Sequence, residues 1–263
     1  MGHIRLGEIP KTRKWQAVVA TVASEEGGLL HEQVADIAGK AIDAAHNGLS
    51  QAIQDAGLVT SFYVLTRAVL AARSDNWIDQ LADLGVDLPA EPSTFDLVSG
   101  LQAAVEDEVY TRGKPSDVAE MSLSALGDAL SVLVAPQAET LFGSGVDDLQ
   151  AAVRSCSTEA GFSRLGQVFF GRFLARYLNF YLSRVTAAQV GGAALPNIGE
   201  VTAFNEALIR HCEQSAFIVQ RYSGEWMSKT RYEQGITPEN TAGFVAVAVK
   251  KLRAELKKQG AGA

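Results

Sequence analysis

The stretch LLHEQVADIAGKAIDAAHNGLSQAIQDA, residues 29–56, decides the fold class. Its apolar side chains recur every three or four residues, at Leu30, Val34, Ile37, Ala41, Ala45, Leu49 and Ile53. This spacing is the period of one face of an α-helix, whereas a half-buried β-strand would alternate apolar and polar residues. We therefore predict a long amphipathic helix over residues 29–56.

Gly57 is expected to separate this helix from a second one. Glycine permits tight turns, and helical spacing of apolar residues resumes over residues 58–73. A helical hairpin is the expected result. Asp75 can cap a short helix after it, and the proline-containing stretch 85–92 is the predicted internal linker.

Helix starts are recognisable in the second half of the chain. Ser93 and Asp96 resemble a capping box, with Asp in place of the usual Glu, before a helix that ends near Arg112. Ser116 can cap the next helix. Pro136 removes a backbone donor from that helix, so we expect a kink or a division there.

The longest helices are expected towards the end of the chain. They cover residues 161–189 and 198–231, and the glycine- and proline-containing stretch 191–196 separates them. A final helix begins at the sequence Thr-Pro-Glu, residues 237–239, where threonine caps, proline suits the first turn and glutamate suits the helix dipole. We expect its first half to pack and its basic second half to extend into water.

These patterns predict an all-α fold, a multi-helix bundle of roughly eight to ten helices, several of them long. No segment shows strands alternating with helices, a glycine-rich strand-to-helix turn or a repeat of fixed period. The expected organisation is a basic N-terminal arm over residues 1–14, a helical hairpin region over 15–88 and a main helical bundle over 93–259. We expect the parts to form one integrated globular unit.

Composition and charge limit the classes of protein. Hydrophobic residues make up 47% of the 263 residues and charged residues 20%, which favours a packed core over disorder. The formal net charge is −7, but it is unevenly distributed. The first 14 residues carry +3 and the last 18 carry +4, so the residues between them carry −14. Basic ends therefore flank an acidic body.

The chain has no sequence feature that indicates export or membrane insertion, so we predict a soluble, cytoplasmic protein. Its two cysteines, Cys156 and Cys212, are too few for a disulfide framework and do not form a C-x-x-C motif. The N-terminus lacks the apolar run of a signal peptide and the serine or threonine of a myristoylation motif. The most apolar stretches, 58–72 and 168–182, both contain arginine, which disfavours membrane spans.

Motifs for catalysis, metal binding or nucleotide binding are missing, so we predict no catalytic residue, no metal ligand and no cofactor. The four histidines do not stand in H-E-x-x-H or E-x-x-H spacing, and no serine lies in G-x-S-x-G. Cys212 fits the apolar face of its helix and is interpreted as a buried thiol. An enzyme remains a third hypothesis, with a site assembled from scattered residues such as His31, His46, His211 and Glu213.

Residues 161–184 interleave seven aromatic side chains with Arg164, Arg172, Arg176 and Arg184. The aromatic residues lie on nearly every side of the expected helix, which is more than one core face requires. A central helix buried on several sides explains this, as does an oligomer contact. Aromatic and arginine side chains together can also bind nucleic acid.

Our leading functional hypothesis is a non-enzymatic helical assembly or accessory subunit that acts through protein–protein contacts. In it, the basic arm or the basic tail docks on an acidic surface of a protein partner, or of another copy in a homo-oligomer. The alternative is a nucleic-acid-binding component. The candidate partner-binding residues are Lys11, Arg13, Lys14, Trp15, Arg164, Arg172, Arg176, Trp226, Lys250, Lys251, Arg253, Lys257 and Lys258. Trp226 could equally anchor the last helix.

Overall fold

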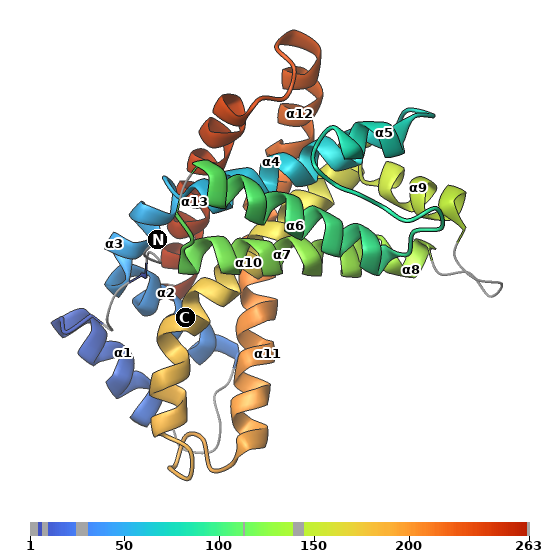
Figure 1. The fold of residues 1–263 in the computed structure, drawn as a ribbon. Coiled ribbons are helices and arrows are strands. Elements are labelled where there is room, and N and C mark those ends of the chain that lie inside the picture. Colours follow the sequence, from blue (N-terminus) through green and yellow to red (C-terminus); the bar gives the residue numbers. More distant parts are fainter. Residues whose placement is uncertain (1–4, 7–9, 25–30, 113, 139–144, 262–263) are drawn as a thin grey trace.

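The secondary structure of the protein is helical (Figure 1). The computed structural model describes residues 5–6, 10–24, 31–112, 114–138 and 145–261. Within these residues there is no β-strand, and an isolated bridge joins Val190 and Leu195. The predicted all-α multi-helix bundle is confirmed.

The helices differ widely in length, and α10, with 30 residues, is the longest of the described elements. In chain order they are α1 (Arg13–Ser24), α2 (His31–Ala44), α3 (His46–Ala52), α4 (Ala56–Ala71), α5 (Trp77–Ala82), α6 (Thr94–Arg112), α7 (Asp117–Leu133), α8 (Ala135–Ala138), α9 (Val146–Ser155), α10 (Glu159–Ala188), α11 (Ile198–Ser215), α12 (Phe217–Glu233) and α13 (Pro238–Ala261).

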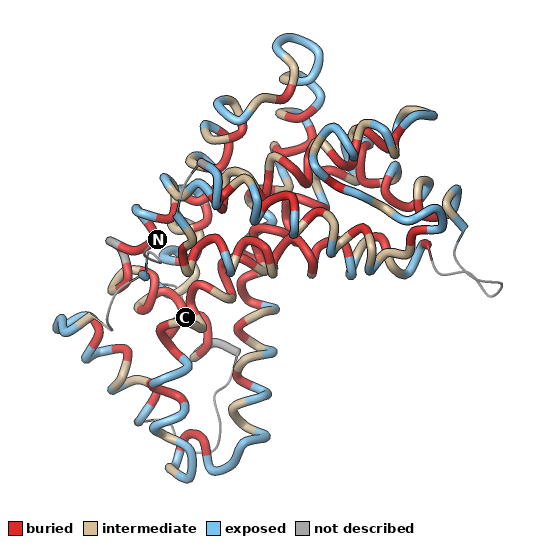
Figure 2. The backbone as a smooth tube through the Cα atoms, viewed as in Figure 1, coloured by how far each residue is buried: buried red, intermediate tan, exposed pale blue. Residues whose placement is uncertain are grey.

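Helix α10 runs through the centre of the molecule and packs against α2, α7, α11 and α12. Figure 1 shows α6 and α7 side by side, and α11 beside the C-terminal half of α10. The buried residues follow this central helix and its neighbours (Figure 2). Six of the seven aromatic side chains in residues 161–184 are buried, and Phe180 is partly buried. The core interpretation of this stretch is therefore confirmed.

Aromatic rings from three distant parts of the sequence meet at the centre. The ring of Phe62 on α4 lies 5.0 Å from that of Phe170 on α10. It also stacks on the ring of Phe244 on α13 at 5.3 Å between centroids. Trp226 on α12 stacks on Phe244 in turn, at 4.3 Å. Such pairs contribute about 0.5–1.5 kcal/mol each beyond the burial of their area.

Three of the predicted helix starts are formed, at Ser93, Ser116 and Thr237. The backbone N–H of Asp96 donates to the Ser93 hydroxyl at 3.2 Å, and the Ser93 N–H donates to the Asp96 carboxylate at 2.9 Å. The Ser116 hydroxyl accepts from the N–H of Ala119 at 2.9 Å. The Thr237 hydroxyl accepts from the N–H three residues on at 3.3 Å. Each bond satisfies a donor that the first turn of a helix leaves free.

The prediction of one helix over residues 29–56 is wrong, because the chain breaks at Ala45 between α2 and α3. The Ala45 carbonyl oxygen accepts the Tyr177 hydroxyl at 2.7 Å as well as the Leu49 N–H at 3.3 Å. A side chain that inserts into the backbone ladder in this way bends a helix. The break is therefore caused by a contact with α10, which local periodicity does not report.

Gly57 does not form the predicted turn. It lies in the first turn of α4, and Asp55 caps that helix by accepting from the Gly57 N–H at 2.8 Å. A Cβ atom on Gly57 would lie 2.3 Å from the Cβ of Ala119 on α7. The glycine is thus needed for the close approach of α4 and α7.

Two further predictions of helix boundaries are wrong, and one is confirmed. Residues 198–231 form two helices that meet at Ala216, where the Ser215 hydroxyl donates to the carbonyl four residues back at 2.9 Å, a bond that often bends helices. Asn76, not Asp75, takes the cap position of α5. The expected division at Pro136 is present, between α7 and α8.

The expectation that the basic half of the last helix extends into water is wrong. Helix α13 packs along α2 to its end, with Leu252 and Leu256 buried. A Cβ atom on Gly39 of α2 would lie 3.1 Å from the Cα of Gly260. The two helices therefore approach closely at a pair of glycines.

One described stretch, Asp117–Ala138, is long and apolar enough to cross a membrane by length and composition. It comprises α7 and α8, and half of its most apolar window is buried inside the protein. A core helix passes the same test, and α7 packs on α4, α6 and α10. It differs from the stretches 58–72 and 168–182, which the sequence marks as most apolar.

Replacement of Gly57 by alanine tests the close approach of α4 and α7. We expect Gly57→Ala to lower the free energy of unfolding by about 2–3 kcal/mol, because the added methyl group overlaps Ala119. Gly243→Ala is the matched control, since nothing lies within 4 Å of the methyl group that it adds in α13. The control should gain about 0.5–1 kcal/mol from helix propensity. Urea unfolding of both variants measures the difference, and equal stability would contradict this account.

Candidate functional site at Asp43

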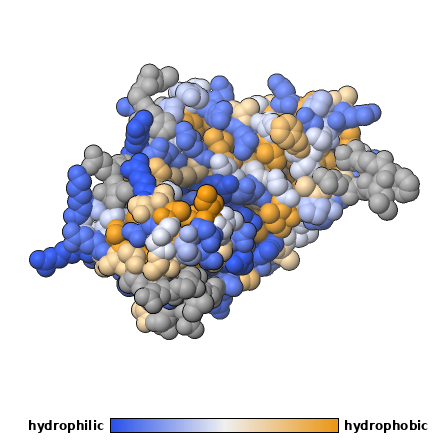
Figure 3. All heavy atoms as spheres, turned by 90° about the horizontal axis from the view of Figure 1, so that it is seen from below, coloured by the Kyte–Doolittle hydropathy of each residue, from blue (hydrophilic) through white to orange (hydrophobic). Residues whose placement is uncertain are grey.

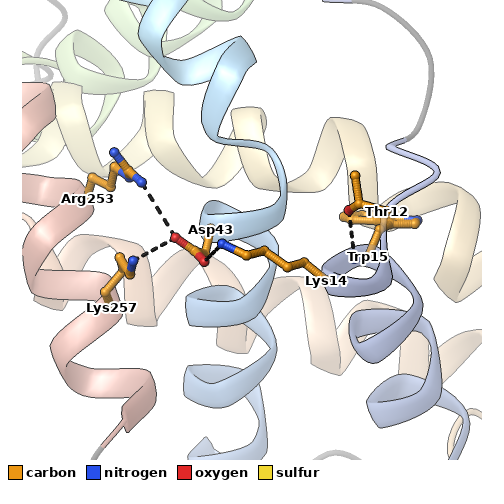
Figure 4. A network of polar contacts seen from close by, with 6 residues as sticks. All are labelled: Thr12, Lys14, Trp15, Asp43, Arg253 and Lys257. Carbon is orange, nitrogen blue, oxygen red and sulfur yellow. Dashed lines mark hydrogen bonds and ion pairs between the residues drawn. The ribbon is translucent and has the colours of Figure 1, made fainter.

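Asp43 lies in the last turn of α2 and is surrounded by three cations (Figure 4). Its carboxylate is 2.5 Å from the Lys14 ammonium, 2.6 Å from the Lys257 ammonium and 3.5 Å from the Arg253 guanidinium. A negative charge at the C-terminal end of a helix is unfavourable, because the helix dipole is negative there. The three cations offset this cost and join α1, α2 and α13.

Packing on both sides holds these side chains in place. Thr12 accepts the Trp15 N–H at 3.3 Å and so caps α1, the helix that carries Lys14. Trp15 itself is 4% exposed and meets the ring of Tyr181 edge-on at 6.0 Å. The buried Leu256 precedes Lys257 on α13. The cations therefore project from helices that the core fixes.

The electrostatics of the cluster leave it positive. Hydrogen bonds from Lys14 and then Lys257 hold the pKa of Asp43 well below its usual range, so the carboxylate stays ionised. Three cations face one carboxylate, which leaves a formal excess of +2. The Lys14 and Lys257 side chains remain 64% and 46% exposed. These ammonium groups can therefore contact a further anionic group from solvent.

The basic residues predicted at the two chain ends come together in this cluster. Lys14 belongs to the N-terminal arm, whereas Arg253 and Lys257 belong to the tail. Lys257 follows Asp43 by 214 residues in the sequence. Lys250 is exposed and lies on the same stripe of α13, at the spacing i, i+3 and i+7. Arm and tail thus form one surface, which we call the basic cluster: Lys14, Lys250, Arg253 and Lys257.

Other predicted partner-binding residues are engaged elsewhere. Trp15 is buried, and Trp226 stacks on Phe244, so both anchor helices of this chain. The Lys251 ammonium lies 4.8 Å from the centre of the Tyr222 ring, a cation–π contact within the fold. Among the remaining predicted residues, Lys11, Arg13 and Lys258 are exposed.

Three arginines of α10 are also held within the chain, whereas Arg184 on the same helix is exposed. Arg172 pairs with Glu213 on α11 at 2.8 Å, and Arg176 pairs with Asp128 on α7 at 2.5 Å. Arg164 donates to the side chain of Gln167 at 2.6 Å. The aromatic neighbours of these arginines are buried in the core. The three arginines therefore do not lie beside exposed aromatic rings on which nucleic-acid bases could stack.

The residues of the enzyme hypothesis are only partly described. The side chains of His31 and His46 lie outside the described residues. His211 on α11 is 3% exposed, Cys212 is fully buried, and burial raises the pKa of its thiol. The buried-thiol interpretation is thus confirmed. In the described part of the chain, no group of three or more histidine, cysteine, aspartate or glutamate side chains could hold a metal ion.

Sequence reasoning missed an acidic cleft of about 750 Å³ between α4, α6 and the start of α13. Five carboxylate residues line it, and they come from four separate segments: Asp55, Asp83, Asp107, Glu108 and Glu239. The charge of −14 between the basic ends was the available sequence signal. A net charge does not show which carboxylates lie close together in the fold. Only the tertiary structure places these carboxylates around one cleft.

Exposed apolar side chains do not single out another face. Among the large apolar side chains of the described residues, the largest exposed fractions belong to Tyr232 on α12 (91%), Phe95 on α6 and Ile198 on α11 (both 75%). These side chains stand on three different helices. Seen from below, hydrophobic residues form several separate groups among hydrophilic ones (Figure 3). Charge therefore distinguishes the candidate surfaces better than hydrophobicity.

Comparison with protein-family models, curated proteins and solved structures finds no match for this chain.

Replacement of Asp43 by asparagine tests the cluster. We expect Asp43→Asn to lower the free energy of unfolding by about 1–2 kcal/mol at neutral pH, since it leaves three facing cations without their carboxylate. Asp36→Asn is the control, because Asp36 pairs with Lys40 within α2 and such a pair contributes about 0.3–0.5 kcal/mol. Urea unfolding measures both variants.

The effect should depend on pH in a defined direction. The folded-state pKa of Asp43 is lowered, so its contribution is complete above the unfolded pKa of about 3.9 and is lost as pH falls towards the folded value. The difference between the native protein and Asp43→Asn should be constant above about pH 5 and shrink below about pH 4. A difference that grows on acidification would contradict this assignment.

Proposed function

We propose that the protein is a non-enzymatic helical accessory subunit that acts through protein–protein contacts, and that the basic cluster is its docking surface. The supporting observation is the convergence of cations from both chain ends around one carboxylate. In this model the cluster binds an acidic surface of a protein partner. The carboxylate of Asp43 orders the cations without neutralising them.

Two physical properties suit the cluster to docking. The cations are held by packed helices, so less side-chain entropy is lost on binding than for flexible lysines. Their charge opposes that of the remaining body, which carries −14 between the basic ends. Attraction between two surfaces of opposite charge speeds the encounter of the two proteins and orients them as they bind.

Protein is favoured over nucleic acid as the partner. Arg172 and Arg176 are neutralised by Glu213 and Asp128. The aromatic side chains that would stack on bases are in the core. A polyphosphate would also be repelled by the acidic body, whereas a protein partner needs to match only the local surface.

A poly-glutamate peptide is a direct probe of the docking surface. We expect it to bind at low salt and to dissociate as salt is added, because exposed charges are screened. Lys250→Glu should weaken binding by about tenfold, since it reverses one charge of the cluster without a contact to Asp43. Lys229→Glu is the matched control, as Lys229 is exposed on α12. Fluorescence anisotropy of a labelled peptide measures both.

Two outcomes would contradict the proposal. Binding of poly-glutamate that is equal in Lys250→Glu and Lys229→Glu would show that the cluster is not the surface used. Tighter binding of a single-stranded oligonucleotide than of poly-glutamate, at the same salt concentration, would favour the nucleic-acid alternative instead.

A further inference from the structure

We infer that the acidic surface that the basic cluster binds is the acidic cleft of a second copy of this chain. This inference rests on the proposed function, because it names the partner of the same docking surface. It is carried by the shape of the cleft, by charge complementarity and by the position of both surfaces on α13.

Apolar and acidic side chains both line the cleft. Residues 56, 59 and 63 of α4 line it at helical spacing, and Ala103 and Ala104 of α6 face them. Asp83 and Asp107 are exposed carboxylates at its edge. Its volume of about 750 Å³ is large enough for several side chains. Such a surface suits lysine side chains, whose methylene stems cover apolar area while the ammonium stays at the rim.

The charges of the two surfaces are complementary. Five carboxylate residues line the cleft, and no lysine, arginine or histidine is among its described lining residues. The basic cluster has a formal excess of +2 from Lys14, Arg253 and Lys257 over Asp43, and Lys250 adds a further positive charge. The exposed carboxylates of Asp83 and Asp107 would face the cations of the cluster across the contact, and opposite charges across an interface favour association.

The arrangement on α13 excludes closure within one molecule. Glu239 and Ala242 in the first turns of α13 line the cleft, whereas Arg253 and Lys257 near its other end belong to the cluster. Glu239 and Lys257 are about 27 Å apart along the axis at a rise of about 1.5 Å per residue. A helix fixed by the core keeps this separation, so the cluster cannot enter the cleft of its own chain.

Contact between copies would therefore be heterologous, with different surfaces of the two molecules meeting. Each copy that docks its cluster leaves its own cleft free for a third. Such contacts close into a ring when the rotation between copies permits and otherwise continue as a filament. Because the contact is between exposed charges, self-association should weaken strongly with added salt.

Sedimentation velocity of the full-length protein tests the inference. We expect the native protein to associate at low salt, with a dissociation constant that rises at least tenfold at high salt. Asp107→Lys, in the cleft, and Lys250→Glu, in the cluster, should each weaken association at least tenfold. Asp147→Lys is the control for the added charge, since Asp147 is exposed on α9 and does not line the cleft.

A mixture of the two interface variants distinguishes this contact from general repulsion. The Asp107→Lys protein retains an unaltered cluster, and the Lys250→Glu protein retains an unaltered cleft. The mixture should therefore recover association through one native contact, while each variant alone stays monomeric. Circular dichroism of each variant establishes that the helices are intact.

Three results would overturn the inference: a native protein that is monomeric at low salt, association that survives Asp107→Lys, or a mixture that stays monomeric. These are separable from failure of the proposed function. A monomer that still binds poly-glutamate through Lys250 removes only the second copy as partner. A protein that neither associates nor binds poly-glutamate removes both.

Discussion

Burial of the aromatic side chains of α10 is the constraint on which the rest of the structure depends. Phe170 meets Phe62 of α4, and Phe62 stacks on Phe244 of α13, so rings from three distant segments pack against one another. Aromatic rings bury large areas and prefer a few relative orientations, so they limit how the helices can cross. The directions of α4, α10, α12 and α13 follow from this packing.

The same packing determines where the charges lie. Because Phe244 fixes the first half of α13 in the core, and Leu252 and Leu256 fix the second half, the helix behaves as a rigid spacer. Its acidic start borders the cleft, and its basic end reaches Asp43. The proposed docking surface and its inferred counterpart are thus two ends of one element. A change in the core that rotates α13 would displace both together.

The helix dipole gives Asp43 a particular role. In the last turn of α2 the carboxylate adds negative charge to an already negative helix end, which favours cations nearby. Lys14 and Lys257 come from the two ends of the sequence, and both pair with this one anion. Asp43 therefore contributes to stability and also organises a surface that remains positive.

Helix type and helix starts were readable from the sequence, because apolar periodicity and caps such as Ser116 and Thr237 act within a few residues. The sequence also determined that the ends are basic and the body acidic. Tertiary structure decided the break at Ala45, which depends on the side chain of Tyr177, and the role of Gly57 at α7. It alone brought Lys14, Arg253 and Lys257 to one carboxylate and gathered the cleft from four segments. The reason is physical: local signals report the neighbours of a residue along the chain, whereas a site depends on which helices pack together.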